Sequence, residues 1–229
     1  MKKASRQERK VKAATVFGGA AASPAGENIE STRFWFLTIF TVAFILRLFY
    51  LFQIDTIPLF EHLAGDARTY HEWGRRIAAG EWLGAGVFYQ APLYPYFLGI
   101  LQFVFGETLW LVRLIQITLG ALSCSLIFLI GQQLFSRPAG IISGFILASY
   151  GPGLFFDGLI EKSNLDLFLL TVILLLIFSV GDEANRAKWL GVGAVLGLLA
   201  LSRENALILV PVVPCWIALS SAPVLRTTR

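Results

Sequence analysis

Long apolar runs are the feature that most constrains what this chain can fold into. Two of them, residues 34–52 and 109–130, each carry a single charged side chain. A helix that crosses the hydrocarbon core of a bilayer needs about 20 such residues. Later runs have the same character, although some are shorter: residues 141–156, 165–180, 189–202 and 206–219. Because backbone groups in lipid must be satisfied within each segment, we predict an all-α, polytopic membrane protein with about six transmembrane helices.

Composition excludes the common alternatives. Hydrophobic residues make up 56% of the chain and charged residues only 15%, against about 25% charged in ordinary soluble domains. A mean hydropathy of +0.68 agrees with burial in lipid rather than in water. A disordered chain, a coiled coil and most soluble globular domains are therefore excluded. Cys124 and Cys215 both lie in apolar runs, so we expect packing residues rather than a disulfide or a metal pair.

The charge pattern predicts which side of the membrane each segment faces. Residues 1–33 hold seven Lys or Arg against three Glu, and we expect a disordered, cytoplasmic tail. Nucleic-acid binding by this tail is the less favoured interpretation because an apolar run follows directly. Arg137 and the pair Arg186 and Lys188 mark later cytoplasmic loops. The membrane module then spans residues 34–225, with residues 53–108 as its outer loop and residues 226–229 returning to the cytoplasm.

A seventh apolar run, residues 92–106, is predicted not to cross. Its length of about 15 residues reaches only about 22 Å as a helix, which is short of a hydrocarbon core of about 30 Å. The predicted topology also agrees with the positive-inside rule only if this run stays at the outer boundary of the membrane. Before it, Tyr70, Trp73 and Ile77 share one face of a short amphipathic helix that ends at Gly80. We expect this helix to lie on the membrane surface.

Charged side chains converge on the outer face in the predicted topology. The carboxylates are Asp66 and Glu161, and the cations are Arg47, Lys162 and Arg203. Cations there could hold a lipid-linked phosphate while a carboxylate takes the proton of an acceptor hydroxyl. Each member also has a simpler interpretation. Asp66 can cap a helix, Glu161 and Lys162 can be a solvated pair, and Arg47 can extend to the interface.

An ordered set of motifs then resembles a known superfamily. The stretches are Gly65-Asp66-Ala67-Arg68-Thr69-Tyr70-His71, Tyr89-Gln90-Ala91-Pro92-Leu93-Tyr94-Pro95, Phe155-Phe156-Asp157-Gly158, Glu161-Lys162 and Ser202-Arg203-Glu204-Asn205. Over residues 34–215 the chain resembles GT-C glycosyltransferases, most of all the branch of bacterial protein-mannosyltransferase-like and lipid A aminoarabinose transferase-like enzymes. The resemblance implies that the chain is an N-terminal portion of such an enzyme, in a bacterial inner membrane.

The resemblance also implies a reaction and its residues. Asp66 matches the catalytic base or acceptor-orienting aspartate. Glu161 matches a second acidic residue, with Asp157 as its competitor. Arg203 matches the contact to the donor phosphate, supported by Lys162 and Arg47, and the substrate loop holds Tyr70, His71 and Gln90. The donor is a polyprenyl-phosphate sugar, the anomeric centre inverts, and the acceptor is a lipid, a glycan or a protein. The resemblance leaves a divalent metal open, since many members of this branch work without one whereas oligosaccharyltransferase relatives use a divalent cation. The sequence has no aspartate-rich cluster, which favours the metal-free case, so we expect no cofactor.

Two other functional classes stay open at this stage. One is a non-catalytic membrane subunit of the same architecture. The other is a small transporter or lipid-handling protein. A transporter would show inverted repeats, and its broken helices would place polar groups near the midplane. The sequence shows no repeat and gathers its polar groups at one face, which favours the transferase.

Overall fold

A computed structural model of the protein describes residues 29–83, 90–178 and 186–221, and within these ranges every regular element is a helix. The predicted all-α class is confirmed. Predictions for most of the basic tail, for residues 181–185 and for residues 226–229 fall outside the described residues. In chain order the helices are α2 (Ile29–Ile54), η1 (Pro58–Phe60), α3 (Asp66–Ala78), α4 (Leu93–Phe105), α5 (Leu109–Leu134), α6 (Arg137–Ala148), α7 (Gly151–Gly158), α8 (Ser163–Phe178), α9 (Arg186–Ser202), η2 (Glu204–Ile208) and α10 (Leu209–Ser221).

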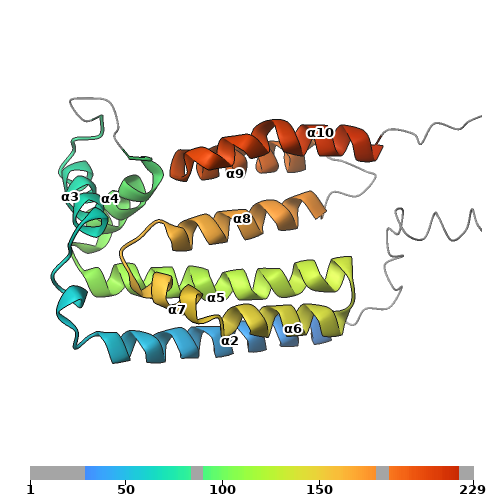
Figure 1. The fold of residues 1–229 in the computed structure, drawn as a ribbon, viewed down its shortest axis with the longest axis horizontal. Helices are drawn as coiled ribbons and strands as arrows, with labels where there is room; N and C mark the ends of the chain where they lie inside the picture. Colours follow the sequence, from blue (N-terminus) through green and yellow to red (C-terminus); the bar gives the residue numbers. More distant parts are fainter. Residues whose placement is uncertain (1–28, 84–89, 179–185, 222–229) are drawn as a thin grey trace, which may run out of the picture.

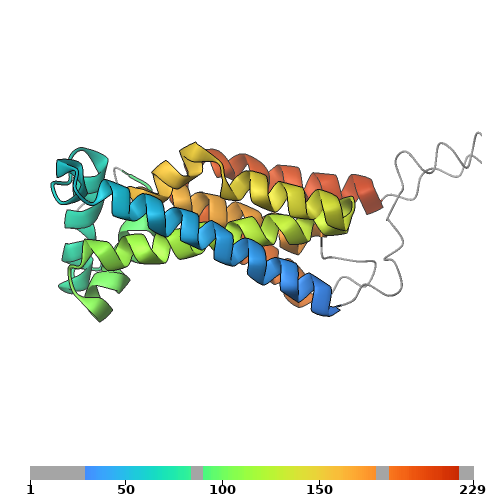
Figure 2. The ribbon, with the colours of Figure 1, turned by 90° about the horizontal axis from the view of Figure 1, so that it is seen from below.

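The apolar helices form an elongated bundle. Figure 1 shows α2, α5, α6, α8, α9 and α10 running lengthwise, whereas α3 and α4 lie across one end. The turned view in Figure 2 shows the same arrangement, with the first residues of α2 and the last of α10 at the opposite end. The apolar run at residues 92–106 is therefore the crosswise helix α4, as its short length predicts. Each of the other predicted runs forms a lengthwise helix or pair of helices.

The lengths of these helices differ more than the six predicted crossings imply. In the described part of the chain, α2 and α5 are each long and apolar enough to cross a membrane. The successive helices α6 and α7 pass the same test together, but they are bent by 52° at the break between them. The helices α8 and α9 have 16 and 17 residues, so each extends only about 25 Å. The protein is thus a polytopic membrane protein in which α6 and α7 form a bent pair of apolar helices.

Small residues allow the lengthwise helices to approach closely. A Cβ added at Gly140 on α6 would lie 2.5 Å from the carbonyl oxygen of Phe128 on α5. This close contact of backbones is typical of helix pairs in membranes. Cys124 is buried in the same region, as predicted, whereas Cys215 on α10 is exposed. Large apolar side chains cover the outward surfaces of α2 and α6, as lipid contact requires: Phe34, Leu37, Phe49, Ile142 and Ile146.

The crosswise helices α3 and α4 pack tightly against each other. A Cβ added at Gly99 on α4 would lie 2.7 Å from a methyl group of Ile77, and one added at Gly74 on α3 would lie 2.9 Å from Cβ of Leu98. After α3, Gly80 adopts φ +101°, a conformation that glycine favours, so the helix ends where predicted. The expectation that α3 lies on the membrane surface stays a prediction. Its apolar face is covered by α4 within the protein, which satisfies the same amphipathic pattern.

Candidate functional site

Charged side chains from distant segments meet around one buried tyrosine. Tyr70 on α3 is 1% exposed, and its ring stands edge-on to Tyr94 of α4, with 5.2 Å between ring centroids. The pKa of Tyr70 is raised to about 12, chiefly because the side chain is buried. The next contributions come from nearby carboxylates, in the order Glu161, Asp66 and Asp166, whereas the guanidinium of Arg203 acts in the opposite direction. The structure therefore brings Asp66, Glu161 and Arg203 to one end of the bundle.

Asp66 begins α3 but does not cap it. The cap position belongs to Gly65, and this end of the helix has no side-chain capping hydrogen bond. Instead, Oδ1 of Asp66 accepts a hydrogen bond of 3.1 Å from Nε2 of Gln90. The Asp66 side chain is exposed. A negatively charged side chain in the first turn of a helix also interacts favourably with the helix dipole. The simple capping interpretation of Asp66 is therefore wrong, and its side chain remains exposed.

Arg203 is held by a carboxylate that is not among the predicted site residues. Nε of Arg203 donates to Oδ2 of Asp166 at 2.5 Å, and Nη2 lies 3.3 Å from Oγ of Ser163. The other oxygen of Asp166 accepts from the hydroxyl of Ser202. Asp166 is 9% exposed and Arg203 is 48% exposed, so the guanidinium is anchored along one edge and open on the other. A carboxylate inside an apolar run was the signal that could have identified Asp166.

Glu161 and Lys162 lie on the connection between α7 and α8 and are both part-exposed. The interactions of Tyr94 indicate where this connection lies. Burial raises the pKa of Tyr94 well above its usual value, the charge of Glu161 raises it next, and a backbone hydrogen bond at Glu161 lowers it. The hydroxyl of Tyr94 donates to Oε1 of Gln116 on α5 at 2.9 Å. Glu161 therefore sits where α4, α5 and α8 meet.

Arg47 is not with these exposed cations. It is 1% exposed, and its Nε donates to Oδ2 of Asp157 at 2.6 Å. Asp157 is equally buried, so of the two acidic candidates only Glu161 is accessible at the end of the bundle. Arg47 does not extend to the interface, because its own helix α2 and the helices α5 and α7 enclose its side chain. We assign Arg47 no contact with a donor.

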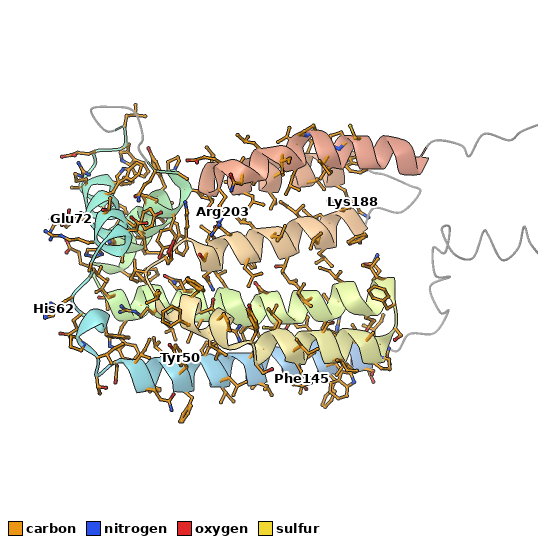
Figure 3. All side chains as sticks on the ribbon, viewed as in Figure 1. Tyr50, His62, Glu72, Phe145, Lys188 and Arg203 are labelled. Atoms are coloured by element: carbon orange, nitrogen blue, oxygen red, sulfur yellow. The ribbon has the colours of Figure 1, made fainter. Side chains whose placement is uncertain are left out.

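His71, expected in the substrate loop, faces α4. Its Nδ1 lies 3.0 Å from Nε2 of Gln102, within hydrogen-bonding distance. Burial lowers the pKa of His71, and the charge of Arg75 lowers it further, while Glu107 and Glu72 raise it. Figure 3 shows Glu72 and Arg203 toward the end that carries α3 and α4, and Lys188 toward the opposite end. Among the described residues, no group of three or more His, Cys, Asp or Glu could hold a metal ion.

Comparison with known proteins adds one match. A family model described as dolichyl-phosphate-mannose-protein mannosyltransferase matches residues 89–228, which is more than half of the chain. The matched part contains Gln90, Glu161, Lys162 and Arg203, whereas Arg47, Asp66, Tyr70 and His71 precede it. Neither the curated proteins nor the solved structures give a match.

Proposed function

The chain belongs to the dolichyl-phosphate-mannose-protein mannosyltransferase family of membrane glycosyltransferases, and we propose that it transfers a sugar from a polyprenyl-phosphate carrier to a lipid, glycan or protein acceptor. The reaction is proposed for the end of the bundle that carries α3 and α4. The observation that carries this proposal is the cluster around Tyr70, where Asp66, Glu161 and Arg203 arrive from three separate segments. The carboxylates supply the negative charge that the reaction requires, and the arginine supplies the positive charge.

The proposed roles follow from charge and accessibility. The exposed carboxylate of Asp66 accepts the proton of an acceptor hydroxyl as that hydroxyl attacks the anomeric carbon. The bond from this carbon to the phosphate oxygen breaks in the same step, which inverts the configuration. The free edge of Arg203 holds the departing phosphate, and Lys162 adds a second positive charge. Glu161 accepts hydrogen bonds from sugar or acceptor hydroxyls, and Gln90 orients Asp66.

Substitution of Asp66 by asparagine tests this assignment. Asp66→Asn keeps the shape and the hydrogen bond to Gln90 but removes the proton acceptor. We expect transfer from a polyprenyl-phosphate sugar to fall about 10²–10⁴-fold, the usual contribution of a general base. Glu81→Gln removes an exposed carboxylate from the same outer segment and should leave transfer unchanged. Near-normal transfer by Asp66→Asn would overturn the catalytic role and favour the non-catalytic subunit.

The same proposal puts α3 and α4 on the outer, non-cytoplasmic side of a bacterial inner membrane. Supporting this orientation, basic residues lie at the opposite end of the bundle, where Nη1 of Arg137 donates to Oγ of Ser31 at 3.1 Å. Positive charge near the ends of spanning helices favours the cytoplasmic side. In a Cys215→Ser background, Glu61→Cys should react with a membrane-impermeant thiol reagent in intact cells. Reaction only after permeabilisation would reverse the orientation.

A further inference from the structure

The bend between α6 and α7 is held by one buried arginine. The helices α6 and α7 meet at an angle of 52°. Arg47 on α2 contacts both halves, because its Nη1 lies 3.4 Å from the carbonyl oxygen of Ala148 and its Nε bonds Asp157. Ala148 ends α6, and Asp157 lies in the last turn of α7. The guanidinium thus spans the break from the last turn of one helix to the last turn of the next.

The end of α7 and the residue after it are tied to α5 at three consecutive carbonyl groups. Nε2 of Gln116 donates to the carbonyl oxygens of Asp157 and Leu159, at 3.3 and 2.6 Å. Between them, the carbonyl oxygen of Gly158 accepts from Nε of Arg113 at 2.9 Å. The chain has little freedom over these residues, and Glu161 comes two residues later. The position of Glu161 is therefore determined by contacts that lie deeper in the bundle.

The ion pair extends this constraint to the start of α8. Oδ1 of Asp157, the oxygen not bonded to Arg47, accepts from Nδ2 of Asn164 at 2.5 Å. The same amide group lies 3.0 Å from the carbonyl oxygen of Gln116. Asp157 and Asn164 thus bracket the segment that carries Glu161 and Lys162. There is little spare room, because a Cβ at Gly120 would lie 2.8 Å from Nε of Arg47.

We propose that Arg47 and Asp157 are positioning residues, which fix the α7–α8 connection so that Glu161 faces the transfer site. This inference rests on the proposed function. Stability alone is a weak reason for a buried ion pair, because well-packed apolar residues of similar volume often serve as well. What apolar residues cannot supply is the directed set of bonds from Arg47 to Ala148 and from Asp157 to Asn164. The pair is buried and contacts no substrate, so it acts through Glu161.

Two variants separate positioning from folding. Asp157→Asn leaves the charge of Arg47 without its partner and can fail to fold. Arg47→Met/Asp157→Leu removes both charges together and should insert and fold. Arg137→Met is the matched control, since it removes an arginine from the opposite end of the same bundle. Each is made in the full chain and assayed for transfer from a polyprenyl-phosphate sugar, with kcat and KM determined separately.

A second readout does not depend on transfer. A nitroxide attached through Glu161→Cys, with Cys124→Ala and Cys215→Ala, reports the mobility of the connection by electron paramagnetic resonance. In the double variant we expect a folded protein, a mobile nitroxide and a kcat lower by about 10²-fold, the effect of a displacement near 1 Å, with an unchanged KM for the donor. Arg137→Met should change neither signal.

Several outcomes would overturn the inference. One is a folded double variant with normal kcat, and another is a nitroxide that stays immobile in it. Failure of the proposed function gives a different pattern. In that case Asp66→Asn transfers normally while the double variant still mobilises the nitroxide, so the structural role stands without the catalytic one.

Discussion

Two arginine–aspartate pairs in this protein share one geometry and differ in their surroundings. In each, Nε of the arginine meets Oδ2 of the aspartate, at 2.6 Å for Arg47 and Asp157 and at 2.5 Å for Arg203 and Asp166. The first pair is completely buried, and Nη1 of its arginine donates to the backbone carbonyl groups of Ala43 and Ala148. The second leaves about half of its arginine exposed. The difference teaches that burial, more than residue type, separates an arginine that holds the fold from one that can hold a ligand.

Removing one partner from each pair should produce the largest difference. Asp157→Asn leaves the Arg47 charge buried without a partner, which typically costs about 3–5 kcal/mol in the free energy of unfolding. Asp166→Asn should cost less than about 1 kcal/mol, because solvent stabilises the exposed guanidinium of Arg203. Thermal unfolding in matched detergent or lipid measures both. Equal losses of stability would contradict the distinction between the two pairs.

The space around the buried pair gives an independent test with a smaller expected effect. An added methyl group at Gly120 would collide with the carboxylate of Asp157 and with Arg47, so Gly120→Ala should destabilise the protein by about 1–3 kcal/mol. Gly193 on α9 has no neighbouring atom within 4 Å of such a methyl group. Gly193→Ala should therefore stabilise by about 0.5–1 kcal/mol, since alanine is the better helix former. A neutral Gly120→Ala would show that the buried pair has room to move.

Acid should lower the stability of the crosswise helices α3 and α4, and this is the smallest of the expected effects. The pKa of His71 in the folded protein lies below its ordinary value of 6.5, because burial disfavours the charged ring. The unfolded chain then binds more protons, so the contribution of His71 to stability is complete above pH 6.5. It is lost as the pH falls from 6.5 through the lowered pKa of the folded state. Unfolding followed from pH 8 to pH 5 should show this loss.

A histidine on the surface serves as the control for this pH dependence. His71→Gln should remove the loss of stability, whereas His62→Gln should leave it, because His62 is exposed. A pH dependence that survives in His71→Gln would assign the effect to another group.

Local sequence patterns predict much of the architecture because they record where apolar side chains fall. The runs at residues 34–52 and 109–130 become α2 and α5, and the short run at residues 92–106 becomes the crosswise α4. The same patterns cannot tell which surface covers an apolar face, and only the structure shows that the apolar face of α3 packs against α4. The pattern predicts the helix but not its packing partner.

The site was predictable by residue type and not by pairing. Asp66, Glu161 and Arg203 could be placed at one face from topology and from a family resemblance. The partners of the two arginines could not, because Arg47 and Asp157 are separated by 110 positions and meet only when α2 and α7 pack together. Asp166 looked like the polar edge of an apolar run, and only the fold places it against Arg203.

The division of roles between the two pairs is tested most directly by donor-dependent kinetics. Arg203→Ala should raise the KM for a polyprenyl-phosphate sugar by about 10-fold or more, the loss expected for a hydrogen bond to a charged group, with kcat recovered at saturating donor. Arg47→Met/Asp157→Leu should lower kcat and leave this KM unchanged. An unchanged KM in Arg203→Ala, or the same pattern of change in both variants, would contradict the account.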